Sequence, residues 1–249
     1  MELTGCSALV TGASLGIGRA TAVALARRGV RVWATGLEVE PLLELERLCG
    51  ATVLAADLSD EHGLSELLGW VGPVDLLVNV AGFGRSEPLQ KIDRGETLEM
   101  LAVNLAAPIR LTAALAPDMV ARGRGHVVNV ASIAGSVGVA HEAVYSATKG
   151  GLIVFSESVR YELAGSGVGV TVVYPAAVDT SFFARSGRPY TRRVPRLVDP
   201  ARVAETLVAA VERNTPEVFL PRWTVVPIRL RGGLPGLFRR AARHSMRRG

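Results

Sequence analysis

The sequence predicts an α/β protein built on one doubly wound, parallel β-sheet. Short apolar segments, each of a length typical of a buried strand, alternate along the chain with longer segments of helical periodicity. No internal repeat or low-complexity linker divides the 249 residues, so we expect a single domain. Hydrophobic residues make up 49% of the chain and charged residues 20%, which supports a large core and excludes a disordered protein.

The expected elements follow one another as strand, helix, strand, which is the order that parallel sheets require. Strands are predicted at residues 6–10, 30–35, 51–55, 74–80, 125–131, 168–174 and 217–220. Helices are predicted at residues 19–28, 39–49, 60–70, 93–121, 143–164 and 200–213. In such a sheet the ligand binds at the carboxyl ends of the strands.

The formal net charge of +5 is concentrated at the C-terminus. Residues 222–249 hold eight arginines and no acid, so the rest of the chain is net negative, which argues against a nucleic-acid-binding protein. We therefore divide the chain into a main part, residues 1–221, and a basic, apolar extension of the same domain, residues 222–249.

Other compositional features favour the cytoplasm. The N-terminus has no basic segment followed by a long apolar run, so no signal peptide is expected, and no apolar run is long enough to predict a membrane-spanning helix. Cys6 and Cys49 lie in segments expected to be buried and predict inert core thiols. No metal site is expected, because the four histidines stand apart, at His62, His126, His141 and His244.

A glycine-rich loop follows the first predicted strand. Gly12, Gly16 and Gly18 are spaced G-x-x-x-G-x-G between this strand and a predicted helix. Glycines in that context permit a tight turn, let the backbone approach a pyrophosphate and aim a helix N-terminus at it. The loop therefore predicts a dinucleotide site.

The end of the second strand should contact the adenosine ribose of such a cofactor. Thr35 and Gly36 stand there and provide no carboxylate for a ribose 2′-hydroxyl, although no basic residue for a 2′-phosphate stands there either. Glu38 and Glu40 come later and are expected to begin the helix 39–49. We favour NADP(H) over NAD(H), because the acid is missing where it is expected.

The next two strand ends also carry candidate cofactor contacts. Asp57, followed by Leu58, could bind the adenine amino group or cap the next helix, and the sequence leaves both alternatives open. Asn79, Ala81 and Gly82 follow the fourth strand, where small residues allow close backbone approach to a ligand.

The candidate catalytic residues lie between residues 104 and 149. Ser132 follows the fifth strand, at the edge of the sheet where ligands bind. Tyr145 and Lys149 are one helical turn apart on one face, so the ammonium should lower the tyrosine pKa and suit the phenol to proton transfer. Asn104 is a poor helix-interior residue, which indicates a bend, a water site or a buried hydrogen bond.

Together these motifs resemble the short-chain dehydrogenase/reductase family over residues 4–220. The matching residues are Thr11, Gly12, Gly16, Ile17, Gly18, Asn79, Ala81, Gly82, Asn104, Ser132, Tyr145 and Lys149. The resemblance implies a Rossmann-type sheet, a nicotinamide cofactor and a homodimer or larger assembly. Further cofactor contacts are then expected from Ser14, Leu15, Thr35, Gly36, Asp57, Leu58, Pro175, Val178 and Thr180.

The same resemblance implies a role for each catalytic residue. Tyr145 is the general acid/base, and Ser132 hydrogen-bonds the substrate oxygen. Lys149 binds the nicotinamide ribose and lowers the tyrosine pKa, while Asn104 holds a water that links the lysine to solvent. The chain departs from the family pattern at Val80, where asparagine is frequent, at Ala176, where glycine is frequent, and in its C-terminal sequence.

These residues predict hydride transfer between a nicotinamide cofactor and a carbonyl or secondary alcohol, with an apolar ketone or 3-oxoacyl-type substrate. The alternative is a catalytically silent nucleotide-binding scaffold or regulator, against which the intact Ser132, Tyr145 and Lys149 argue. A serine hydrolase is disfavoured because no G-x-S-x-G motif surrounds Ser132.

Two further segments are expected to lie near the site. Residues 180–198 are rich in arginine and proline and predict a mobile loop over it. Residues 222–249 interleave apolar side chains with arginines. Three hypotheses suit them: a flap over the pocket or a dimer surface, a peripheral membrane contact, and a docking face for an acidic partner.

Overall fold

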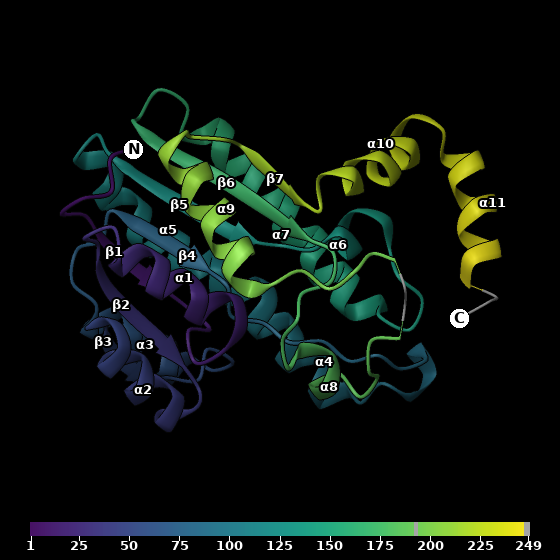
Figure 1. The fold of residues 1–249 in the computed structure, drawn as a ribbon, viewed down its shortest axis with the longest axis horizontal. Helices are drawn as coiled ribbons and strands as arrows, with labels where there is room; N and C mark the ends of the chain where they lie inside the picture. The colour runs from purple at the N-terminus through teal and green to yellow at the C-terminus, as the bar shows by residue number, and fades with distance from the viewer. Residues whose placement is uncertain (192–193, 247–249) are drawn as a thin grey trace.

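The computed structural model describes residues 1–191 and 194–246, except for the side chains of residues 241 and 243–246. Its core is a seven-stranded, all-parallel sheet in the order β3-β2-β1-β4-β5-β6-β7 (Figure 1). The strands are β1 (Ser7–Val10), β2 (Arg31–Gly36), β3 (Thr52–Ala55), β4 (Leu76–Asn79), β5 (Gly125–Val130), β6 (Val168–Pro175) and β7 (Glu217–Leu220). All seven predicted strands are confirmed, with ends that differ by at most two residues.

Helices cover both faces of the sheet, which makes it doubly wound. They are α1 (Gly16–Ala26), α2 (Val39–Cys49), α3 (Glu61–Trp70), α4 (Arg94–Leu101), α5 (Ala107–Ala121), α6 (Ile133–Val137), α7 (Ala143–Glu162), α8 (Phe182–Arg185), α9 (Pro200–Glu212), α10 (Val225–Gly233) and α11 (Pro235–Met246). The sequence did not predict α6, α8, α10 or α11, and α1 begins three residues earlier than expected, at the loop glycine itself.

Alternation along the strands explains the two layers. On β1, Ala8 and Val10 join one buried cluster with side chains of α1, α2 and α9, whereas Leu9 joins another with side chains of α3 and α5. Successive strand residues point to opposite faces, so a strand that is apolar throughout needs helices on both sides. This is why the strands read as continuous apolar runs.

The strand order reverses between β1 and β4, and there the two predicted ligand loops meet. The Thr11 hydroxyl, which follows β1, accepts hydrogen bonds from the backbone N–H groups of Val80 (3.0 Å) and Ala81 (3.1 Å), which follow β4. A reversal of this kind opens a crevice at the carboxyl edge of the sheet. The glycine loop and the segment after β4 therefore form one site.

Residues 94–121 form one continuous helical segment through α4, a π-helical turn (Ala102–Ala106) and α5. Contrary to the expectation from the sequence, this segment is long and apolar enough to cross a membrane by length and composition. A core helix meets the same criterion, and Leu111 and Met119 of α5 are fully buried against the sheet.

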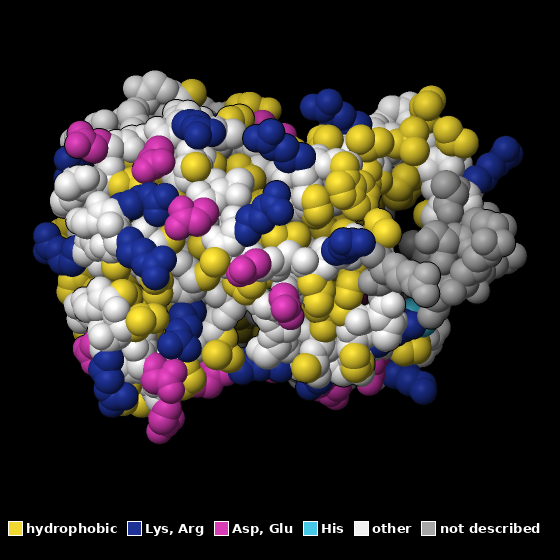
Figure 2. Space-filling view, viewed as in Figure 1, with side chains coloured by type: hydrophobic (Ala, Val, Ile, Leu, Met, Phe, Trp, Pro, Cys, Tyr) yellow, Lys and Arg dark blue, Asp and Glu magenta, His cyan; other side chains and the backbone are white. Residues whose placement is uncertain are grey.

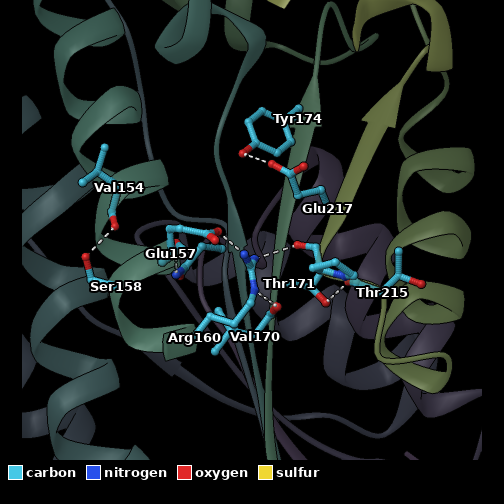
Figure 3. Close-up of polar contacts among 12 residues, drawn as sticks. Val154, Glu157, Ser158, Arg160, Val170, Thr171, Tyr174, Thr215 and Glu217 are labelled. Atoms are coloured by element: carbon cyan, nitrogen blue, oxygen red, sulfur yellow. Dashed lines mark hydrogen bonds and ion pairs between the residues drawn. The ribbon is translucent and has the colours of Figure 1, made fainter. Parts of the chain in front are cut away.

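Arg160 of α7 connects that helix to β6 and to the segment before β7 (Figure 3). Its guanidinium donates to the carbonyls of Val170 on β6 (3.2 Å) and Pro216 before β7 (2.9 Å), and it also pairs with Glu157. Beside it, Thr171 of β6 donates to the Thr215 carbonyl at 2.7 Å. These bonds hold the last strand in register at the edge of the sheet.

Candidate active site

The glycine loop fits a bound pyrophosphate. Gly12 has φ +65°, and a Cβ added to it would lie 2.8 Å from the backbone of Ala81. A Cβ on Gly18 would lie 2.1 Å from the Gly12 carbonyl oxygen, so α1 packs against the loop only because Gly18 lacks a side chain. Leu15, the residue before α1, offers no side-chain cap, which leaves the first N–H groups of the helix available to an anion.

At the adenosine end, the two residues that end β2 are held by packing. Thr35 is fully buried, and its carbonyl accepts a hydrogen bond from the Ala13 N–H of the glycine loop at 2.8 Å. A Cβ on Gly36 would lie 2.1 Å from the Ser14 hydroxyl oxygen. A side chain at position 36 would therefore require Ser14 of the glycine loop to move.

The sequence suggested only that Glu38 begins a helix, but in the structure it also forms an ion pair. It precedes α2 without capping it, and its carboxylate accepts a hydrogen bond from Arg185 of α8 at 2.7 Å. Partial burial raises the pKa of Glu38, but the hydrogen bond and charge of Arg185 outweigh it and hold the pKa below its usual value. A carboxylate and a guanidinium thus both stand near the expected ribose site.

The residues after β3 show whether Asp57 caps the next helix. Asp57 accepts a hydrogen bond from the Ser59 N–H (2.8 Å), whereas α3 is capped by Asp60, which accepts from the Gly63 N–H (2.7 Å). The expectation that Asp57 could cap the helix is wrong, because α3 begins at Glu61 and its cap position is occupied by Asp60. Leu58 is buried in the core, so only its backbone is open to a ligand.

The segment after β4 reaches the candidate catalytic residues. Asn79 is buried and donates to Asn129 on β5 at 2.8 Å, so its side chain joins two strands. A Cβ on Gly82 would lie 2.8 Å from Asn104 Oδ1 and 3.3 Å from Lys149 Nζ. Gly82 therefore lets the backbone pass directly beside Lys149.

Ser132 and Tyr145 meet beside the end of β5. Ser132 immediately precedes α6, and its hydroxyl accepts a hydrogen bond from the Ala134 N–H at 3.1 Å. Tyr145 lies on the first turn of α7 and is 9% exposed, and the Ser132 hydroxyl counteracts the rise in the Tyr145 pKa that burial causes. A Cβ on Gly135 would lie 2.6 Å from the backbone of Lys149, so a glycine in α6 lets the two helices approach closely.

Lys149 is buried and donates from Nζ to the Val130 carbonyl at 2.9 Å, with Nζ 6.0 Å from the centre of the Tyr145 ring. Burial lowers the pKa of Lys149 to about 8. The net shift of the Tyr145 pKa is opposite to the one expected from a neighbouring ammonium. Burial raises the pKa of Tyr145, and only the hydrogen bond with Ser132 opposes that rise.

Asn104 is fully buried in the π-helical turn. Its Oδ1 accepts from the Phe83 N–H (3.0 Å), and its Nδ2 donates to the Phe83 carbonyl (2.8 Å) and to Thr148 (3.2 Å). Turns of this kind often occur at functional sites. Of the three roles considered for Asn104, the structure shows both the helix irregularity and a buried hydrogen-bond network, which fixes the backbone beside Lys149.

The segment after β6 closes over Tyr145. Pro175 ends β6, Val178 bridges to Val198, and the Thr180 side chain approaches Gly16 of the glycine loop. Phe182 of α8 packs on Tyr145, with ring centres 5.3 Å apart. Part of the segment predicted as an irregular loop is thus the short helix α8. Residues 192–193 lie outside the described part of the chain.

Sequence reasoning missed the apolar wall around the tyrosine. Met100 and Ala134 are buried with Tyr145 in one cluster, and Phe83 and Val144 pack against it. These residues come from four separate segments and share no spacing, so only the fold brings them together. At Ala176 the departure from the family pattern is unstrained, because it is not among the non-glycine residues with positive φ.

Comparisons with known proteins agree with this geometry. The sequence model described as short chain dehydrogenase matches residues 7–190. An uncharacterized oxidoreductase of Myxococcus xanthus is 36% identical, over 97% of this chain and 98% of its own length. The ketoacyl reductase HetN of Nostoc is 34% identical, over 88% of this chain and 79% of its own.

Solved structures are similar over nearly the whole chain. A short-chain dehydrogenase from Sphingobium yanoikuyae in complex with NADPH aligns with a TM-score of 0.80 and 27% identity, covering 93% of this chain and 95% of its own. A short-chain dehydrogenase/reductase from Burkholderia phymatum in complex with NAD aligns with a TM-score of 0.83 and 25% identity, covering 93% and 94%. The similar structures thus include one with each nucleotide.

Proposed function

The chain belongs to the short-chain dehydrogenase family and is a nicotinamide-dependent oxidoreductase, and from this premise we propose that it reduces a ketone or 3-oxoacyl-type carbonyl on an apolar substrate. The observation that carries the proposal is the placement of Ser132 before α6 and of Tyr145 on the first turn of α7, with Phe182 packed on the Tyr145 ring. The apolar side chains around this pair suit an apolar acyl or alkyl group. The name of HetN, a ketoacyl reductase, supports the same class of substrate.

In the proposed mechanism each residue acts on the carbonyl oxygen or on its neighbours. The bound nicotinamide supplies or accepts hydride. Ser132 donates a hydrogen bond to the carbonyl oxygen and holds it beside the Tyr145 hydroxyl, which gives its proton as the alcohol forms and takes it back in the reverse direction. Lys149 binds the nicotinamide ribose, and its ammonium then stabilises the phenolate.

Asn104 positions the backbone beside Lys149 and holds the water through which the proton is replaced. The glycine loop binds the pyrophosphate on the N-terminus of α1. Around the adenosine, the nicotinamide and the pyrophosphate, we assign further contacts to the other predicted positions. These are Ser14, Leu15, Ile17, Thr35, Gly36, Asp57, Leu58, Asn79, Ala81, Gly82, Pro175, Val178 and Thr180.

We propose NADP(H) as the preferred cofactor. Gly36 supports this, because the residue that ends β2 has no carboxylate to bind a ribose 2′-hydroxyl. Arg185 supports it too, since its guanidinium stands within reach of Glu38 beside that strand end and suits a 2′-phosphate. NAD(H) would instead use the Glu38 carboxylate.

One experiment tests both proposals. The purified protein is given a panel of ketones, 3-oxoacyl thioesters and sugar carbonyls, each with NADPH and with NADH, and cofactor absorbance is followed. We expect turnover of the apolar ketones and 3-oxoacyl thioesters, with a higher kcat/KM for NADPH. Turnover of polar sugars alone would overturn the substrate class, and a higher kcat/KM for NADH would overturn the cofactor preference.

We further propose that the protein is a cytoplasmic homodimer or larger assembly that binds no nucleic acid, and that residues 222–249 contact the membrane peripherally. Exposed apolar side chains on α4, α5 and α7 support self-association. They are Leu98, Leu101, Val120, Val154 and Tyr161. Light scattering after size exclusion should give at least twice the mass of one chain, and a monomer at micromolar concentration would contradict this assembly.

A further inference from the structure

The C-terminal arm, residues 222–246, projects from the body of the protein. It consists of a 3₁₀ turn (Arg222–Thr224), α10 and α11, and Figure 1 shows α11 standing clear of the sheet and its helices. Among the described side chains, the base of the arm is anchored: Thr224 is fully buried, Ile228 packs on the cluster around Tyr174, and Arg231 donates to the Ser136 carbonyl of α6. The arm therefore has a fixed base, from which α11 projects.

The arm does not pack closely on α6 beyond its base. A cavity of about 330 Å³, lined by Val137 together with residues of α10 and α11, lies between α6 and the arm.

Large apolar side chains of the arm face outward. Trp223 is 48% exposed, Val226 61%, Leu234 58% and Leu237 57%. In Figure 2 hydrophobic side chains gather at the upper right, where α10 lies. Single exposed apolar residues need no explanation, but four on one projecting segment indicate an interaction surface for a protein or a membrane.

The arm is also positively charged throughout. Residues 222–249 hold eight arginines and no acid, and the five whose side chains are described, Arg222, Arg229, Arg231, Arg239 and Arg240, are exposed. None of these five forms an ion pair with a described residue of the chain. Elsewhere on the described surface, arginines such as Arg28 and Arg110 pair with glutamates. The charge of the arm is thus left for a partner.

From these observations we infer that the arm binds the surface of a bilayer containing anionic lipid. Arginines meet the lipid phosphates while Trp223, Leu234 and Leu237 enter the interface, which is the usual division on interfacial helices. A fluid bilayer needs no matching shape, so the break at Leu234 between α10 and α11 is no obstacle. An acidic protein would satisfy the arginines but leave the apolar side chains in water.

The test measures binding of the full-length protein to vesicles, without substrate or cofactor. We expect co-sedimentation with vesicles of phosphatidylcholine containing 30% phosphatidylglycerol, little with pure phosphatidylcholine, and release in 0.5 M salt. The Trp223 emission should shift to shorter wavelength on binding, judged against a Trp223→Phe variant because Trp33 and Trp70 also emit.

Two variants test the two parts of the surface. Arg229→Gln/Arg239→Gln/Arg240→Gln and Leu234→Ser/Leu237→Ser should each weaken vesicle binding at least tenfold. Matched controls change equally exposed residues outside the arm, Arg31→Gln and Leu48→Ser, and should bind like the parent protein. Circular dichroism melting confirms that every variant is folded.

Several outcomes would overturn the inference. Absence of binding to anionic vesicles would do so, as would equal binding by arm variants and parent. If the leucine variant changes the oligomeric mass while vesicles are ignored, the arm contacts a second copy of the chain. Because binding is measured without turnover, failure here leaves the proposed reaction intact, and an inactive enzyme that binds vesicles leaves the inference intact.

Discussion

At the scale of single residues, burial decides the chemistry of the site. Tyr145 and Lys149 are both almost completely buried, and burial disfavours the charged form of each: it raises the tyrosine pKa and lowers that of the lysine. The phenol is therefore kept protonated, as a proton donor for carbonyl reduction must be. A charge or hydrogen bond that lowers the tyrosine pKa would therefore have to arise when the cofactor binds beside Lys149.

Replacing Tyr145 with phenylalanine should remove the proton donor and little else. We expect turnover of the best carbonyl substrate to fall about 100-fold or more, because general acid catalysis commonly contributes this much. The dissociation constant for NADPH, measured by fluorescence, should change less than threefold. Turnover within a factor of three of the parent would remove Tyr145 from its role.

Lys149 should make stability depend on pH on the alkaline side. Its pKa falls from 10.5 when unfolded to about 8 when folded, so between these values the unfolded chain binds more protons and stability rises with pH. Relative to Lys149→Met, the free energy of unfolding of the parent should increase by about 2 kcal/mol between pH 7 and 9.5. Urea titrations at both pH values measure this, and a constant difference would contradict the shift.

At the scale of elements, glycines and short helical turns place the site more than the long helices do. Gly12 and Gly18 let α1 begin at the pyrophosphate loop, and Asn104 uses a π-helical turn to hold the backbone beside Lys149. The short helix α8 extends from Tyr145, through Phe182, to Glu38, through Arg185. It thus connects the reacting end of the site with the adenosine end.

A matched pair of glycine variants tests the loop. Gly18→Ala places a Cβ 2.1 Å from the Gly12 carbonyl and should weaken NADPH binding more than tenfold, because α1 must move away from the loop. Gly69→Ala, in α3 with open space around the added Cβ, should leave binding unchanged and raise stability by about 0.5–1 kcal/mol. Isothermal titration and thermal melting measure the two effects. Normal binding by Gly18→Ala would show that the loop can relax.

At the scale of the whole molecule, the sheet is also held by buried polar groups away from the site. His126 of β5 shares a hydrogen bond with Thr171 of β6 (2.8 Å), and Thr171 in turn donates to Thr215. Burial, helped by the charges of the N-terminus and Arg160, lowers the pKa of His126 to about 4. The folded sheet therefore keeps this imidazole neutral.

His126 should make the protein sensitive to acid. Between pH 6.5 and 4 the unfolded chain binds the additional proton, so stability falls as pH falls through this range. We expect His126 to account for a loss of about 2 kcal/mol between pH 7 and 4.5, which His126→Gln should not show. Urea unfolding of both proteins at the two pH values tests this. Parallel losses would assign the acid sensitivity to other groups.

The sequence by itself determined the order of the strands along the chain, the glycine loop and the pairing of Tyr145 with Lys149. It did so because strand burial, loop geometry and helical spacing are local properties, readable from a few neighbouring residues. The same local reasoning placed Ser132 at a strand end.

Only the tertiary structure decided which distant residues share an environment. Met100 and Phe182 join Tyr145 from separate segments, and Arg185 meets Glu38 across 147 positions of the chain. The direction of the tyrosine pKa was mispredicted for this reason: spacing reveals the neighbouring ammonium, but burial is the sum of contacts from the whole fold. Local pattern thus predicted the chemical groups, and the packing of the whole chain set their environment.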